Sequence, residues 1–303
     1  MSRIAVGVDI GGSHVTSQLY EIEHHQLVEG TRSRLPIDCH GEAGEVLDGW
    51  CRAIRGSTGG HSLVAMAGIG FAMPGPFDYP SGVARFRGVE KFDALYGVDV
   101  RREVMERLDL PQGYPVVFQN DATCFAIGVS YESEVKKHAR FLAITLGTGF
   151  GSTFIHNHQP VAGQDGVPQS GFLYDEPFNG SNADNHFSTR WFTKRYQNLT
   201  GKKVSGVKEL ADMASDDQVV ATLFRDFGDN LGFFLAPYLK SFNAACLVMG
   251  GNIALAYPLF RDRLHQKLHA AGIHPEVLVS SLGEEAALSG AAALCSATGG
   301  RVG

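Results

Sequence analysis

The sequence predicts an α/β protein in which mixed or parallel sheets are covered by helices. Apolar runs typical of strands alternate along the chain with segments of helical period. One glycine-rich turn also occurs twice, each time after an apolar run and before a second strand, about 140 residues apart. This repetition predicts two similar domains that face each other across a cleft.

The apolar patterns place the individual elements. Six runs predict strands, and they lie at Ile4–Val8, Leu63–Phe71, Val116–Phe118, Phe141–Thr145, Ser152–Ile155 and Ala245–Met249. The letters SQLYEI and STFIHN, which follow the two glycine turns, also read as strands. Helical spacing occurs at Ala43–Arg55, Val100–Leu108, Ala122–Val135, Asn185–Gln197 and Phe224–Ser241.

Composition narrows the class of protein. The 303 residues allow two modest domains, and the 44% apolar and 19% charged fractions are those of an ordinary globular protein. A net charge of -6 without a basic run argues against nucleic-acid and membrane-surface partners. The five scattered cysteines favour reduced thiols over a disulfide framework or a zinc site. Without an apolar span or a signal peptide, we expect a cytoplasmic protein.

The two glycine turns are candidate phosphate sites. Glycines at strand ends let backbone N–H groups point into one space, which makes an anion-binding nest, and a hydroxyl stands in each turn. The alternative is a pair of tight hairpins whose glycines only satisfy a positive φ. No P-loop pattern occurs in the chain. The turn residues are Gly11, Gly12, Ser13, Gly147, Thr148 and Gly149.

Asp9 lies at the end of the first strand, beside the first glycine turn. A carboxylate next to bound phosphates would be repelled unless a cation stood between them. Mg²⁺ is commonly held by one or two carboxylates together with substrate phosphates. We therefore expect Asp9 to act on Mg²⁺, and indirectly; the alternative is an aspartate that caps the turn.

Asn120 and Asp121 stand at a junction between a strand and a helix, in VVFQNDATCFAIG. Asp121 could accept a proton from a hydroxyl as a general base, while Asn120 could bind the substrate by donating and accepting hydrogen bonds. The competing interpretation is a helix N-cap, for which Asn and Asp are preferred. Both can hold, because a helix N-terminus also favours the ionised carboxylate.

Two further loops are candidate binding elements. The Pro- and Gly-rich segment FAMPGPFDYPSG, residues 71 to 82, would make a rigid wall for a substrate pocket. The segment LVMGGNIALA, residues 247 to 256, has the order strand, two glycines, helix. Gly250 and Gly251 would let a flat nucleoside lie against the backbone at a helix start.

Together these motifs resemble, in order and over nearly the whole chain, those of the ROK family of bacterial sugar kinases and related proteins, within the actin/Hsp70/hexokinase superfamily. The segments Asp9–Ser13 and Leu146–Gly151 resemble its two phosphate turns. Pro74-Gly75-Pro76 stands where the family has a V-P-G-P loop on the sugar side. Asn120-Asp121-Ala122 is similar to E-N-D-A, whose Asp is the family's catalytic base, and Met249-Gly250-Gly251-Asn252 resembles the adenosine motif.

The resemblance implies a two-lobed actin-like ATPase fold of the ribonuclease H type, with a cleft between the lobes. A small lobe would span residues 1–118 together with about 290–303, and LGEEAALSGAAAL resembles the family's closing helix. A larger lobe, residues 119–289, would carry the catalytic Asp, the second phosphate turn and the adenosine motif. The resemblance also implies a homodimer.

The chain departs from the family's pattern on the sugar side. The family has G-E-x-G-H followed by a cysteine-rich zinc loop, whereas the best match here is Gln169-Ser170-Gly171-Phe172. Phe172 cannot ligate zinc, and the acids and His186 that follow lack convincing metal spacing, so we expect no zinc. Where many members have an N-L pair that contacts the sugar, this chain has Lys91-Phe92.

The resemblance implies ATP- and Mg²⁺-dependent phosphorylation of a hexose or hexose derivative. Asp121 would be the base, with Asn120, Gly75, Gln169 and Lys91 on the sugar side. The alternatives are a catalytically weak sugar-binding or regulatory protein and a kinase that uses inorganic polyphosphate. A transcriptional repressor of the family would need an N-terminal helix-turn-helix, and only three residues precede the first strand here.

Overall fold

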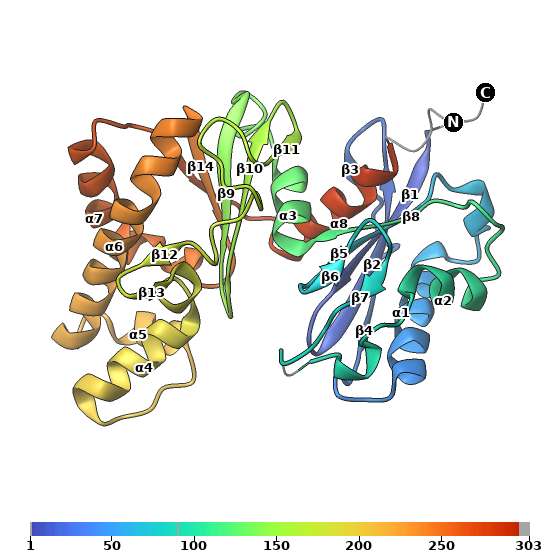
Figure 1. Ribbon diagram of the computed structural model, residues 1–303, viewed down its shortest axis with the longest axis horizontal. Coiled ribbons are helices and arrows are strands. Elements are labelled where there is room, and N and C mark those ends of the chain that lie inside the picture. The colour runs from blue at the N-terminus through green and yellow to red at the C-terminus, as the bar shows by residue number, and fades with distance from the viewer. Residues whose placement is uncertain (1, 90, 297–303) are drawn as a thin grey trace. The chain divides into compact units, whose positions relative to one another are not determined.

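The computed structural model describes residues 2–89 and 91–296 of the chain, which divides into two compact units (Figure 1). The first unit comprises Met1–Tyr131 and Glu284–Gly303, and the second comprises Glu132–Gly283. These divisions differ from those expected near residues 118 and 290. The end of the last strand of the first sheet, with Asp121 and the helix that it begins, therefore belongs to the first unit.

The first unit is built on a six-stranded sheet with the order β3-β2-β1-β5-β8, in which β4 also pairs with β2. β1 is antiparallel to β2, whereas β1, β5 and β8 run parallel. Among its described residues, the unit also has four α-helices and a small hairpin of β6 and β7. The strands are β1 (Ile4–Ile10), β2 (His14–Glu21), β3 (Gln26–Leu27), β4 (Ser33–Pro36), β5 (Ile69–Met73), β6 (Phe77–Asp78), β7 (Val83–Ala84) and β8 (Val116–Asn120).

The helices of the first unit cover both faces of its sheet (Figure 1). They are α1 (Ala43–Thr58), α2 (Val100–Arg107), α3 (Asp121–Val129) and α8 (Glu284–Ala293). Alternate residues of β1 such as Val6 and Val8 pack into the core under α1, because neighbouring side chains of a strand point to opposite faces. Gly7 and Asp9 therefore point to the other face, where α8 lies.

Helix α8 packs against its neighbours at backbone distance. A Cβ at Gly7 would overlap the carbonyl oxygen of Leu288, and one at Gly70 would overlap that of Ala291. Gly290 of α8 makes the same approach to the carbonyl of Cys124 in α3. The expected closing helix is therefore confirmed, and glycines on both sides let it lie against β1, β5 and α3.

We expect Gly290→Ala to destabilise the fold by about 3 kcal/mol or more, because the added methyl group meets a backbone carbonyl that no side-chain rotation can move. The measurement is the free energy of unfolding in urea. Gly44→Ala is the matched control, since Gly44 lies in helix α1 with nothing within 4 Å of its ideal Cβ among the described residues. Equal stability of the two variants would contradict this packing.

The second unit is built on a five-stranded sheet with the order β11-β10-β9-β14-β15. β9 runs antiparallel to β10 and parallel to β14, which in turn runs parallel to β15. Leu142 and Ile144 of β9 alternate into a core formed with α6. Its strands are β9 (Arg140–Leu146), β10 (Phe150–His156), β11 (Gln159–Val161), β12 (Pro177–Phe178), β13 (Ser181–Asn182), β14 (Cys246–Gly250) and β15 (Glu276–Val279), and its helices are α4 (Thr189–Thr200), α5 (Val207–Met213), α6 (Gln218–Phe242) and α7 (Tyr257–Ala270).

Most expected elements are confirmed, but several bounds were wrong. The strand expected over Leu63–Phe71 begins only at Ile69, because Gly68 takes a φ of 152° next to Pro115 and Leu63–Ala65 forms a 3-10 turn. Helix α3 ends at Val129 and not at residue 135. The residues that follow form separate turns, in which the N–H groups of Val135 and Lys136 donate to the carbonyl of Glu132.

Two helices of the second unit begin elsewhere than expected. Helix α4 starts at Thr189, because the Asn182 side chain accepts the N–H of Asn185 and closes a separate 3-10 turn. Helix α6 starts at Gln218, where Asp217 caps it by accepting the N–H groups of Val219 and Val220. The described residues contain no helix with the length and apolar character needed to cross a bilayer.

Candidate functional site

Three of the predicted motifs meet at one edge of the first unit's sheet. Because β1, β5 and β8 are parallel neighbours, their carboxyl ends lie side by side. Asp9 stands at the end of β1, Gly75 just after β5, and Asn120 and Asp121 at the end of β8. The carboxyl edge of such strands is where α/β proteins commonly bind ligands.

The first glycine turn joins β1 to β2. The N–H of Gly11 donates to the carbonyl of His14 at 3.0 Å, which closes the turn, while Gly12 and Ser13 are exposed. Gly12 does not adopt a left-handed φ, and its ideal Cβ would meet only the Cδ of Lys91, at 3.9 Å, among the described residues. Neither backbone strain nor packing therefore accounts for a glycine here, and the bare backbone is open to a ligand.

Asn120 and Asp121 do cap helix α3. The side chain of Asn120 accepts the N–H of Ala122 at 3.0 Å, and the Asp121 carboxylate accepts the same group at 2.8 Å. Asp121 stays accessible to solvent. The pKa of Asp121 is raised by desolvation, an effect that its accessibility limits, while the Ala122 N–H and the positive charge of Lys91 lower it. Asn120 and Asp121 thus cap helix α3, and the carboxylate of Asp121 remains accessible to solvent.

Tyr79 links the Pro- and Gly-rich loop to Asn120. The amide Nδ2 of Asn120 donates to the Tyr79 hydroxyl at 3.2 Å, and that hydroxyl donates to the carbonyl of Met73 at 3.3 Å. The same hydroxyl would lie 3.5 Å from a Cβ at Gly75. No sequence motif singled out Tyr79, although it is the one tyrosine of the loop.

Lys91 belongs to the same edge. Its side chain approaches Gly12, and its charge acts on Asp121. The next residue, Phe92, is fully buried against Trp50 and Phe86 in a left-handed conformation with a φ of 60°. Such a conformation is uncommon for a bulky residue and here anchors Lys91.

The pKa of Asp9 rises from 3.8 to about 7, first through desolvation and then through the carboxylates of Asp121 and Glu284. The guanidinium groups of Arg34 and Arg32 oppose this rise. A partly buried acid that is held near other acids is relieved by a bound cation. Mg²⁺, which is commonly held by one or two carboxylates together with substrate phosphates, would relieve the charge of Asp9 in this way.

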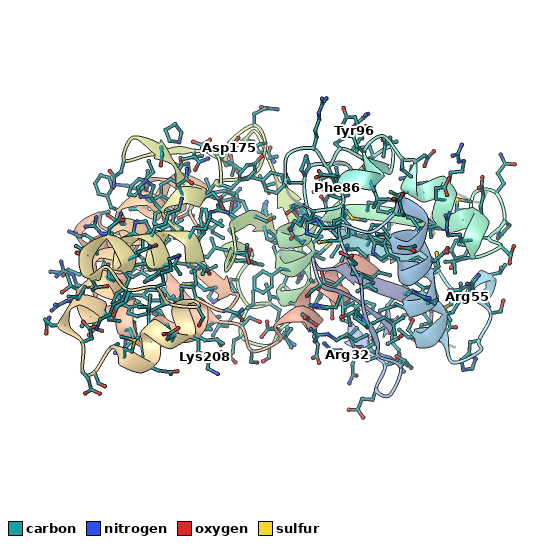
Figure 2. All side chains as sticks on the ribbon, turned by 90° about the horizontal axis from the view of Figure 1, so that it is seen from below. Arg32, Arg55, Phe86, Tyr96, Asp175 and Lys208 are labelled. Atoms are coloured by element: carbon teal, nitrogen blue, oxygen red, sulfur yellow. The ribbon has the colours of Figure 1, made fainter. Side chains whose placement is uncertain are left out.

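Glu284, the first residue of α8, is bound to the first glycine turn. It pairs with the Nε2 of His14 at 2.9 Å, with Arg32 at 2.9 Å and with Arg34 at 3.3 Å. Figure 2 labels Arg32 beside this end of α8. The other ring nitrogen of His14 lies 3.2 Å from the hydroxyl of Ser13. The sequence did not predict this network, because its members are distant in the chain and only the acid at the start of the closing helix marks it.

The second unit repeats the arrangement. β9 and β14 are parallel, with Gly250 paired to Thr145, so the second glycine turn lies at the same edge as Gly250 and Gly251. In the turn, Thr148 and Gly149 are exposed. Gly147 adopts no left-handed φ and has nothing within 4 Å of its ideal Cβ among the described residues. As at Gly12, an open backbone is what the glycine provides.

Two residues outside the turn hold it in place. Thr189, at the start of α4, donates its N–H and its hydroxyl to the carbonyl of Gly147 at 2.8 and 2.9 Å. The Asp184 carboxylate accepts the N–H of Phe150 at 2.8 Å and is paired with Arg190. Asp184, one of the acids that follow Phe172 in the sequence, thus supports the turn.

Gly250 is the last residue of β14, and Gly251 follows it. A Cβ at Gly251, whose φ is 86°, would overlap the carbonyl of Leu146, so this residue lets the two loops touch. Asn252 is exposed. The expectation that this pair opens a helix was wrong, because a 3-10 turn, Ala254–Ala256, intervenes before α7.

Gln169 lies in an exposed loop of the second unit. Its amide group would stand 2.7 Å from a Cβ at Gly163, so the two residues pack together. Within the described ranges, no group of three or more His, Cys, Asp or Glu side chains is arranged to hold a metal ion.

Known proteins resemble this chain over most of its length. A glucokinase of Thermotoga maritima is 27% identical over 255 residues, covering 75% of this chain and 78% of the relative. An N-acetyl-D-glucosamine kinase of Haemophilus influenzae is 23% identical, covering 95% and 98%. The crystal structure of a ROK family glucokinase from Streptomyces griseus in complex with glucose and AMPPNP superimposes with a TM-score of 0.72 at 23% identity, covering 96% and 98%.

The structural match shows a shared fold, that of the ROK sugar kinases, with mixed sheets flanked by helices. The family model for ROK proteins matches residues 5–298. That match contains both glycine turns, the aspartate at the start of α3 and the closing helix. On this evidence the chain belongs to the ROK family.

Proposed function

We propose that this protein is a carbohydrate kinase that transfers the γ-phosphoryl group of ATP to a hydroxyl of a hexose or hexose derivative. The observation that carries the proposal is the meeting of Asp121, Lys91 and Asp9 beside the open backbone of Gly12. The names of the relatives support the reaction class, since they are a glucokinase and an N-acetyl-D-glucosamine kinase.

In this mechanism Asp121 accepts the proton of the sugar hydroxyl as that oxygen attacks the γ-phosphorus. Desolvation raises the pKa of Asp121 toward the range in which a carboxylate is an effective base. The positive charge of Lys91 opposes this rise in pKa and so favours the ionised carboxylate. Asn120, held by Tyr79, and the Gly75 loop orient the sugar in the first unit. In the second unit, Gln169 is the candidate sugar-binding residue.

The glycine turns bind the donor. Gly11, Gly12 and Ser13 in one unit, and Gly147, Thr148 and Gly149 in the other, offer N–H groups and hydroxyls to the phosphates. Gly250, Gly251 and Asn252 bind the adenosine end. Mg²⁺, when bound, supplies positive charge against the phosphate oxygens, and Asp9 acts on it indirectly. Positioning and electrostatics then provide most of the acceleration.

The test is a coupled ADP-release assay with Mg·ATP and a panel of hexoses, amino sugars and N-acetyl sugars. We expect turnover with one or a few sugars, above the rate of ATP hydrolysis without sugar. A parallel series with inorganic polyphosphate, followed by sugar phosphate formation, tests the donor. No turnover with either donor, while ATP still binds by calorimetry, would contradict the proposal and favour a regulatory sugar-binding protein.

A further inference from the structure

The start of helix α4 is fixed to the second glycine turn. Thr189, its first residue, makes two hydrogen bonds to the carbonyl of Gly147, one from its N–H at 2.8 Å and one from its hydroxyl at 2.9 Å. The next residue, Arg190, therefore leaves the backbone in the first turn of α4, directly beside the glycine turn.

Asp184 brings the guanidinium group of Arg190 to the other end of the same turn. Its Oδ1 accepts the N–H of Phe150 at 2.8 Å and would lie 3.1 Å from a Cβ at Gly149. Its Oδ2 pairs with the Nη2 of Arg190. One carboxylate thus separates the positive charge of Arg190 from the end of the turn.

Arg190 has donors left for a ligand. About half of its side chain, 49%, is exposed, and its ion pair with Asp184 uses one of its two Nη nitrogens within residues 2–89 and 91–296. Arginine offers five N–H donors in a planar fork that matches phosphate oxygens. Asp184 fixes one side of this fork, so less freedom is lost when a phosphate binds to the other.

The glycine turn itself lacks a cation. Gly147, Thr148 and Gly149 provide only neutral N–H and O–H donors, and the chain has no P-loop lysine. The terminal phosphates of a nucleoside triphosphate carry several negative charges, which a fixed arginine stabilises more strongly than neutral donors do. The second unit supplies such a charge at Arg190.

We propose that Arg190 binds the β- or γ-phosphate of the donor and that Asp184 positions it, an inference that rests on the proposed ATP-dependent function. The competing explanation is a structural ion pair that only holds the loop before α4 against the turn. The two differ in one measurable respect. A phosphate-binding arginine discriminates between nucleotides by their number of phosphates, whereas a structural pair affects all nucleotides alike.

The experiment compares the dissociation constants of ATP, ADP and AMP by calorimetry in the full-length protein, its Arg190→Gln variant and its Arg190→Lys variant. We expect Arg190→Gln to weaken ATP binding about tenfold or more, the loss of a charge-assisted hydrogen bond, and to change AMP binding less than twofold. Arg190→Lys should recover part of the affinity, because it restores the charge without the planar fork.

Arg195→Gln is the matched control. Arg195 lies on the same helix with 52% of its side chain exposed, and it pairs with Asp226 at 3.8 Å instead of with a turn residue. This variant should bind all three nucleotides like the wild type. Equal weakening of ATP and AMP in Arg190→Gln, or no weakening, would overturn the role of Arg190.

The same titrations separate this inference from the function on which it rests. If the wild-type chain binds ATP and the Arg190 variants bind it equally well, only the role of Arg190 is wrong. If the wild-type chain does not bind ATP at all, the proposed function fails and this inference fails with it. Melting temperatures of the variants show whether each one is folded, and Arg190→Lys keeps the test possible if Arg190→Gln is not.

Discussion

Asp121→Asn is expected to lower kcat about 10²–10⁴-fold with the sugar that the wild type phosphorylates, because the amide cannot accept the hydroxyl proton. The change preserves shape and the capping geometry. The Oδ1 of an asparagine can still accept the N–H of Ala122, and Asn120 caps the same helix independently. Nucleotide affinity should stay near that of the wild type, since the glycine turns are untouched.

Two measurements check this prediction, the kcat in the ADP-release assay and the dissociation constant of ATP by calorimetry. The matched control is Asp99→Asn, because Asp99 also begins a helix, where it accepts the N–H of Arg102 at 3.0 Å. The control should keep full activity. If both variants turn over like the wild type, Asp121 is a helix cap and not the base.

Asp9→Asn is expected to make the ligand-free protein more stable at pH 8. The pKa of Asp9 is about 7 in the folded chain and 3.8 for an aspartate side chain free in water, so the folded state holds a proton that the unfolded state has released between these values. The wild type therefore loses stability as the pH rises from about 4 to 7. The loss is at most about 4 kcal/mol, and less in practice because Asp9 is only partly buried.

Urea unfolding at pH 5 and pH 8 measures this effect. The gain of Asp9→Asn over the wild type should be larger at pH 8 than at pH 5, since below pH 5 the folded carboxyl is already neutral. Asp78→Asn is the control, because the pKa of Asp78 is shifted in the opposite direction. Hydrogen bonds from Ser81 hold the pKa of Asp78 below its usual range, so the same substitution should bring no gain at pH 8. An Asp9→Asn gain that does not change with pH would contradict the raised pKa.

The Asp9→Asn variant should also lose Mg²⁺-dependent activity. A buried carboxylate destabilises the free protein, and a bound cation removes that penalty. The complex with the cation is therefore stabilised at the expense of the free protein. Asp9→Asn would thus be more stable and less active, with an activity that no longer rises with Mg²⁺ in the ADP-release assay. A variant that is stabilised and fully active would remove Asp9 from the proposed mechanism.

Local patterns predicted the sheets well where a strand is short, apolar and followed by glycine. β1, β9 and β14 were identified in this way, because burial on both faces makes such strands continuous apolar runs. The wrong bounds lie where local turns replace an element that the apolar pattern would continue. Separate turns follow α3 at Val129, and Gly68 delays β5, although the apolar pattern of the neighbouring residues is not broken at either place.

The domain limits depend on contacts between distant segments, which a pattern along the chain does not contain. The resemblance to the family implied that residues 119–131 belong to the second lobe, whereas the structure places them in the first unit. The reason is packing between distant segments. Gly290 and Gly128 allow α3 and α8 to approach at backbone distance, and this contact joins residues more than 150 positions apart in sequence.

The sequence by itself determined the family, the α/β class and the positions of both glycine turns, because these depend on residues that are neighbours in the chain. Only the tertiary structure decided which groups act on one another. The parallel order of β1, β5 and β8 brings Asp9 to Asp121, and the start of α8 brings Glu284 to His14. Such pairs form across the fold, where distance is set by strand order and helix packing and not by spacing along the chain.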